Sequence, residues 1–105
     1  LKDAKAGNLA AEVLLGDLYA RSFQWHDAIY WYEIAGNHGS PYAQLELAKI
    51  YANGHGVKQD RRKAMAWIIS SAKLDYAPSQ LWLAKLYHEG EFTEKNEYLA
   101  FQWYL

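Results

Sequence analysis

Four histidines are the residues of this chain best suited to chemistry: His26, His38, His55 and His88. Histidine binds zinc or transfers protons when a second ligand or a nucleophile lies at a set spacing from it. His88 is followed by Glu89 but by no second histidine four residues on, which excludes the helical zinc-protease motif. His26 and His38 have no partner at ligand spacing, and no glycine-flanked nucleophilic serine is present. The sequence therefore predicts no catalytic residue, no metal ligand and no cofactor.

The remaining histidine, His55, lies between Gly54 and Gly56. Such a loop could contact a phosphate, but a lone G-x-G outside a strand–turn–helix context is a weak signal of a nucleotide site. A structural role is favoured, because Gly54 can adopt the left-handed backbone that ends a helix and Gly56 adds a second flexible point. We therefore expect this loop to join two helices.

The segment around this loop, residues 41–72, has the pattern of a helix–loop–helix unit. Ser40 followed by Pro41 is a helix start, because serine caps the free N–H groups and proline loses no hydrogen bond at the first position. Asp60 is placed to cap the second helix. Both helices have one apolar face, and two such helices joined by a short loop pack as an antiparallel hairpin.

The same unit recurs before and after this segment with a period of 36 residues. Tyr19 lies only 32 residues before Tyr51, because the loop that follows it, residues 20–24, is four residues shorter. We predict that Trp25 fills the gap left by this shortening. The repeated residues are small where two helices approach closely and large where neighbouring hairpins pack together. They are Gly54, Gly56, Tyr19, Tyr51, Tyr87, Trp31, Trp67, Trp103, Ala28, Ala64 and Ala100.

The fold class predicted is all-α, a single repeat array over residues 1–105. Residues 1–6 read as the tail of a preceding helix, and Asn96 as the cap of the last helix. The repeats are 8–39 (repeat 1, short loop), 40–75 (repeat 2, full motif) and 76–105 (repeat 3, truncated).

The second repeat carries a recognisable motif: Ala43-Gln44, Leu47-Ala48, Tyr51, Gly54-x-Gly56-Val57, Asp60, Lys63-Ala64, Trp67 and Ser71-Ala72. It resembles the Sel1-like repeat family, relatives of the tetratricopeptide repeats. The resemblance covers essentially the whole chain and implies a right-handed α-solenoid of antiparallel hairpins, whose concave face binds proteins as a scaffold or adaptor. Phe92 and Thr93 replace the second Gly and the Val in repeat 3, so we predict a different path for that loop.

Composition narrows the possible partners. An apolar content of 51% with 16% aromatics is ample for a core. A net charge of −1 argues against nucleic acid, and no apolar run approaches the roughly 20 residues of a membrane span. Open repeat ends make self-association possible. The family resemblance points to a bacterial envelope or periplasm, and the cytoplasm stays open.

We expect partner binding on the first helix of each hairpin, where side chains vary while the repeat frame is kept. Trp82 stands out because its equivalents are Leu14 and Glu46, and tryptophan is enriched in interfaces. The alternative is that Trp82 packs against the third repeat. The full set of candidates is Trp82, Glu46, Lys49, Lys85, Asp17, Leu14, Tyr42 and Asn53.

Two charged clusters flank the loops, one basic (Lys58, Arg61, Arg62, Lys63) and one acidic (Glu89, Glu91, Glu94, Glu97). They could form a partner site, but attraction between stacked loops is favoured.

The function predicted is a non-catalytic scaffold that binds a partner protein or peptide. The first alternative is a small-molecule, glycan-binding or hydrolytic module with a groove pocket. The second is an RNA-binding helical repeat, against which Asp17 and Glu46 count.

Overall fold

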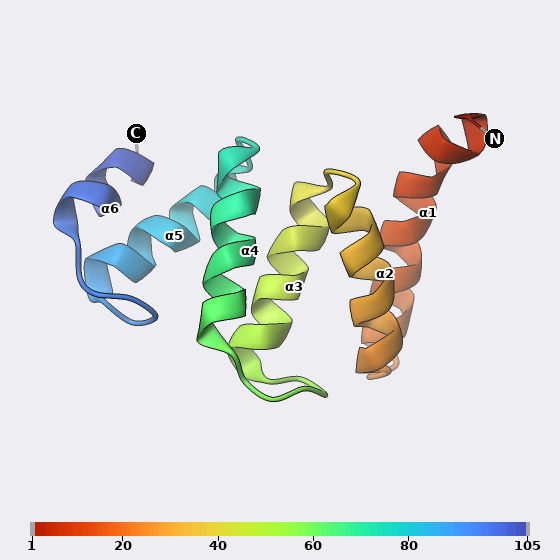
Figure 1. Ribbon diagram of the computed structural model, residues 1–105, viewed down its shortest axis with the longest axis horizontal. Coiled ribbons are helices and arrows are strands. Elements are labelled where there is room, and N and C mark those ends of the chain that lie inside the picture. Colours follow the sequence, from red (N-terminus) through yellow and green to blue (C-terminus); the bar gives the residue numbers. More distant parts are fainter. Residues whose placement is uncertain (1, 105) are drawn as a thin grey trace.

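The computed structural model describes residues 2–104, with side chains from Leu9 onward, and within this range it is entirely helical (Figure 1). Successive helices pack against one another along the longest dimension of the molecule, from the N-terminal to the C-terminal end. The prediction of an all-α solenoid of hairpins is therefore confirmed. The helices are α1 (Lys2–Arg21), α2 (Trp25–Asn37), α3 (Pro41–Asn53), α4 (Arg61–Lys73), α5 (Ala77–Glu89) and α6 (Glu97–Tyr104).

The capping residues act as their sequence positions predict. Ser40 Oγ accepts a hydrogen bond from the backbone N–H of Ala43 at 3.1 Å, which starts α3. Asp60 caps α4 in the same way at 3.1 Å, and Asn96 Oδ1 caps α6 at 3.0 Å. Each cap satisfies an N–H group that has no partner within the helix.

The N-terminal helix differs from the prediction. Residues 2–6 and 8–21 belong to one continuous helix, α1, so the expected break between a preceding helix and repeat 1 is wrong; Leu1 lies outside the described residues. The residue at the expected break is Gly7. A single glycine inside a helix costs only about 1 kcal/mol relative to alanine, which is too little to end it.

The loop of the third repeat differs from the prediction in part. The loop between α3 and α4 closes with the N–H of Gly54 on Ile50 O at 2.8 Å and the N–H of Asp60 on Tyr51 O at 2.9 Å. The loop between α5 and α6 has the equivalent bonds, each 36 residues later and both at 2.8 Å. The closing bonds are therefore shared, against the expectation of a different path. The two loops do differ at the substituted residue, because Gly56 has φ 69° whereas Phe92, 36 residues later, has no positive φ.

The second glycine of the repeat 2 loop, Gly56, is needed for a different reason. Gly56 has φ 69°, and a Cβ atom added there would lie 2.3 Å from Cβ of Trp25. Trp25 begins α2 and stacks on His55, with ring centroids 4.7 Å apart. The tryptophan of repeat 1 therefore packs against the loop of repeat 2, and the glycine makes room for it.

The repeated small residues lie at the centre of the core. Ala28, Ala64 and Ala100 are each at most 2% exposed. Trp67 packs against both hydrophobic clusters of the described chain, one centred on α2 and α3 and the other on α4 and α5. Tyr51 is buried, whereas Tyr19, Tyr87, Trp31 and Trp103 are partly exposed.

Adjacent hairpins are also joined by hydrogen bonds from two repeated glutamines. Gln44 Nε2 donates to the carbonyl oxygen of Gly36 at 2.8 Å, and Gln80 Nε2 donates to that of Ala72 at 3.1 Å. Both acceptors lie in the last turn of the preceding helix, whose carbonyl groups lack partners within the helix. The 36-residue spacing of these glutamines therefore reflects a bond between hairpins.

Candidate functional site

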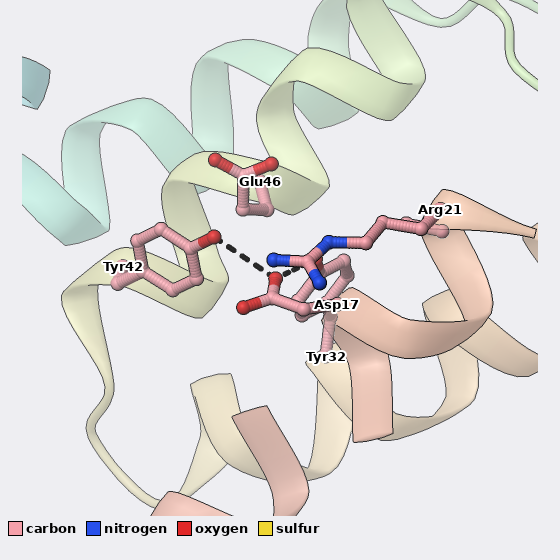
Figure 2. Close-up of a pocket in the computed structure, with 6 residues that line it drawn as sticks. Asp17, Arg21, Tyr32, Tyr42 and Glu46 are labelled. Carbon is pink, nitrogen blue, oxygen red and sulfur yellow. Dashed lines mark hydrogen bonds between the residues drawn. The ribbon is translucent and has the colours of Figure 1, made fainter. Parts of the chain in front are cut away.

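The clearest polar site of the structure is centred on Asp17, in the second half of α1. The hydroxyl of Tyr32, from α2, and that of Tyr42, from α3, both donate to Asp17 Oδ1, the second at 2.9 Å (Figure 2). Three helices thus contribute to one carboxylate. Two donors on a single oxygen fix the orientation of the Asp17 side chain.

The residue before Asp17 makes this arrangement possible. A Cβ atom added to Gly16 would lie 2.6 Å from Cδ1 and Cε1 of Tyr32. Glycine therefore lets the Tyr32 ring, which is only 1% exposed, lie directly against α1. In that position its hydroxyl reaches Asp17.

Both tyrosines remain hydrogen-bond donors at any physiological pH. Burial, and then the hydrogen bond to Asp17, raise the pKa of the Tyr32 hydroxyl well above its usual value of 10.0. The same two causes, in the same order, raise the pKa of Tyr42. Ionising either hydroxyl would place two negative charges side by side in a partly buried site.

A cavity of about 270 Å³ opens beside these hydroxyls, and we call it the acidic pocket. Glu46 faces it from α3, and Figure 2 shows Arg21 extending toward it from the end of α1. Glu46 Oε2 also accepts a hydrogen bond from Lys49 at 3.3 Å. The lining residues are Asp17, Ala20, Arg21, Tyr32, Tyr42 and Glu46.

A second cavity, of about 540 Å³, lies on the N-terminal side of Asp17, and we call it the apolar groove. Leu14 is 56% exposed there and adds apolar surface to the groove. Asp17 lines both cavities, so the two adjoin. The residues of the apolar groove are Leu9, Ala10, Val13, Leu14, Asp17 and Ser40.

The structure brings together part of the set of candidate residues. Leu14, Asp17, Tyr42 and Glu46 line the two cavities, and Lys49 contacts them through Glu46. Lys85 and Asn53 are exposed and line neither.

Trp82 is partly buried. It packs against both core clusters and makes an edge contact with Phe92, with ring centroids 6.3 Å apart. This contact fits the alternative in which Trp82 packs against the third repeat.

Two residues of the acidic pocket, Tyr32 and Arg21, were missed by sequence reasoning. The sequence did contain a signal for Tyr32. The equivalent residue 36 positions later is the fully buried Ile68, so packing at this position requires only an apolar side chain. A hydroxyl at such a position indicates a polar partner. Arg21 lies in the last turn of α1 and had no comparable signal.

Two of the histidines lie beside carboxylates. His38 Nδ1 lies 2.9 Å from Oε1 of the buried Glu12, and His88 Nδ1 lies 2.9 Å from Glu97 Oε1. Within the described residues, no three His, Asp or Glu side chains gather as a metal site requires.

The basic cluster makes contacts other than the expected ones. Arg61 lies 5.3 Å from the ring centroid of Phe92, and Lys63 lies 5.1 Å from that of Tyr51. Between residues 9 and 104 no ion pair joins the basic and acidic clusters, so their attraction at longer range stays a prediction.

Stacked helical hairpins with a groove across their first helices define the class of α-solenoid repeat proteins. The family model for the Sel1 repeat matches residues 26–40, 41–76 and 77–105. The chain belongs to the Sel1 repeat family. Sel1 repeats commonly mediate protein–protein interactions and are typically non-catalytic.

Similar proteins come from several bacteria. The chain is 42% identical over 65 residues to the Sel1-repeat-containing protein YjcO of Escherichia coli K12, and equally to the uncharacterized YjcO of Shigella flexneri. These matches cover 58% of this chain and only 28% of the relatives.

Two solved structures share the fold. The protective antigen c5321 of uropathogenic Escherichia coli, which displays an SLR fold, superposes with a TM-score of 0.85 at 30% identity, over 96% of this chain and 22% of that one. A Sel1 repeat protein from Oxalobacter formigenes gives 0.84 at 29% identity, over 98% and 80%. No helix among residues 2–104 is long and apolar enough to cross a membrane.

Proposed function

We propose that this chain is a non-catalytic scaffold that binds a protein or peptide partner across its first helices, in the groove between α1 and α3. One observation supports this most directly. Residues that vary within the repeat frame, Leu14, Asp17, Tyr42 and Glu46, line two adjoining cavities. In a structural array such positions would carry interchangeable surface residues and would not gather around a cavity.

The size of the groove suits a polypeptide segment. The two cavities together have room for several side chains, and both are open to solvent and adjoin at Asp17, as an extended chain requires. Two carboxylates in the groove repel a phosphate backbone, which counts against RNA. Protein binding therefore fits this groove better than the alternatives.

Site-specific photo-crosslinking in the cells that express the protein tests this proposal. A benzophenone amino acid is placed at Lys49, which is exposed on α3 and contacts Glu46 of the acidic pocket, and in matched controls at Tyr30 or Ala66, both exposed on second helices. We expect a discrete protein adduct from Lys49 and none from the controls. Adducts only from the second helices, or none at all, would show that the groove is not the binding surface.

A further inference from the structure

Asp17 lines both cavities, and only one of its two carboxylate oxygens accepts the tyrosine hydrogen bonds. Both hydrogen bonds to Asp17 within the described chain end on Oδ1, which leaves Oδ2 available to a ligand. Glu46, whose side chain is 24% exposed, faces the same pocket from the neighbouring hairpin. A cation between these helices would contact carboxylates from both hairpins.

The positive groups at the pocket are less well fixed than the negative ones. Lys49, which pairs with Glu46, is 51% exposed, and the interaction of such exposed pairs is weak. Arg21 is exposed in the last turn of α1, and no carboxylate lies within 4.0 Å of it among the described residues. Both cations can move aside, whereas two tyrosine hydroxyls hold Asp17 in place.

A preorganised anion favours a cationic ligand. Binding to a group that is already oriented loses little conformational entropy, and a hydrogen bond to a charged group is stronger than one between neutral groups. The partly exposed side chain of Tyr42 lines the same pocket and adds aromatic surface beside the two carboxylates. An acidic side chain placed there would be repelled by both Asp17 and Glu46.

The apolar groove adds a second requirement. Leu9, Val13 and the exposed Leu14 present apolar surface directly beside Asp17. A ligand that places a cation at Asp17 therefore gains further free energy when a neighbouring apolar group is buried in this groove. A basic residue followed or preceded by a bulky apolar residue satisfies both cavities.

We infer that the groove selects a partner segment in which a lysine or arginine adjoins a bulky apolar residue, with the cation at Asp17 and Glu46 and the apolar side chain against Leu14. This inference rests on the proposed function, because it names the chemistry of the partner at the same site. The inference goes beyond the proposed function because it predicts which partner sequence the groove binds.

Selection from a random-peptide library displayed on phage tests the inference. The immobilised wild-type chain should enrich lysine or arginine next to leucine, isoleucine, valine, phenylalanine or methionine. A synthetic peptide of the enriched sequence should then bind Asp17→Asn at least about tenfold more weakly, as expected for loss of a charged hydrogen-bond partner. Leu14→Ser should weaken it about fivefold to tenfold through lost apolar contact.

Matched variants separate these effects from changes in folding. Asp27→Asn removes the same charge from an exposed position on α2, and Leu18→Ser makes the same change on α1 outside both cavities. Both controls should bind within about twofold of the wild type. In Asp17→Asn the amide oxygen of the new side chain can still accept both tyrosine hydroxyls, so the circular dichroism and thermal unfolding of this variant should match the wild type.

Three outcomes overturn the inference. They are enrichment of acidic peptides whose binding is lost in Arg21→Gln, enriched peptides that bind Asp17→Asn and Leu14→Ser as well as the wild type, and no enrichment at all. Crosslinking from Lys49 in the cell distinguishes failure of the proposed function from failure of this inference. If it succeeds while the library result fails, the proposed function stands and only the partner chemistry is wrong.

Discussion

The fit between Gly16 and Tyr32 allows a sharp test of how the pocket is built. The equivalent pair in repeat 2 is Ala48 with Ile68, so a larger residue on the first helix faces a smaller one on the second. Gly16→Ala places a Cβ atom 2.6 Å from two carbons of the Tyr32 ring. That is about 1 Å closer than ordinary carbon–carbon contact.

The predicted effect combines three contributions. Alanine gains about 1 kcal/mol over glycine in helix propensity. Overpacking costs about 1–3 kcal/mol, because Tyr32 is buried and has no free space to move into. Displacing the ring also weakens the hydrogen bond from its hydroxyl to Asp17. A hydrogen bond to a charged group contributes about 1.5–3 kcal/mol to stability. We expect a net loss of about 2 kcal/mol in the free energy of unfolding, or roughly 10 °C in Tm.

Gly16→Ala should stabilise the chain instead of destabilising it when the Tyr32 ring is absent. In a Tyr32→Ile background, which reproduces the pair of repeat 2, Gly16→Ala should stabilise the chain by about 0.5–1 kcal/mol through helix propensity alone. Urea unfolding followed by far-UV circular dichroism of the wild type, both single variants and the double variant measures this coupling. Equal effects of Gly16→Ala in both backgrounds would refute the proposed steric fit.

Three further predictions concern other parts of the structure. Gly56→Ala should lose about 1–3 kcal/mol more than Gly39→Ala in urea unfolding, because both have positive φ but only residue 56 contacts Trp25; equal losses would mean that backbone strain alone matters. Burial raises the pKa of Tyr32 in the folded state, so its contribution to stability is complete below about pH 10 and falls above it by about 1.4 kcal/mol per pH unit. Tyr32→Phe should make the alkaline decline shallower than in the wild type in unfolding measured from about pH 9 to 11, with Tyr42 accounting for part of the remaining slope; an unchanged slope would contradict the assignment. Trp67→Ala should destabilise the array by about 3 kcal/mol, since its ring packs against both clusters; an unchanged Tm would argue against this role.

The fold was predictable from the sequence because repetition multiplies weak signals. One Ser-Pro start or one glycine stop is a modest indication, but the same features at a 36-residue period constrain one another. The failures were local. The predicted helix break rested on Gly7 alone, and one glycine costs a helix only about 1 kcal/mol. The predicted change in the third loop holds at Phe92, which lacks the positive φ of Gly56, but not for the bonds that close the loop.

The site was only partly predictable, because its geometry depends on residues that the repeat frame conceals. Asp17, Tyr42 and Glu46 were accessible to reasoning, since they vary on the first helices. The contact of Tyr32 with Asp17 was not, because it requires the distance between α1 and α2 that Gly16 sets.

The departures of repeat 1 from the shared frame account for where the pocket lies. Asp17, Tyr32, Tyr42 and Glu46 correspond, one hairpin later, to a set with neither a carboxylate nor a hydroxyl: Lys49, Ile68, Pro78 and Trp82. At that junction Trp82 occupies the position of Glu46 and packs against the core, where Glu46 faces a cavity.

The same backbone arrangement therefore builds an acidic pocket at one junction and a packed apolar contact at the next. The helices and loops supply equivalent positions, and four side chains decide whether a position stabilises the array or faces a ligand. Since only the first of these two junctions combines a fixed carboxylate with an adjoining apolar surface, we expect the binding specificity of residues 9–104 to be concentrated between α1 and α3.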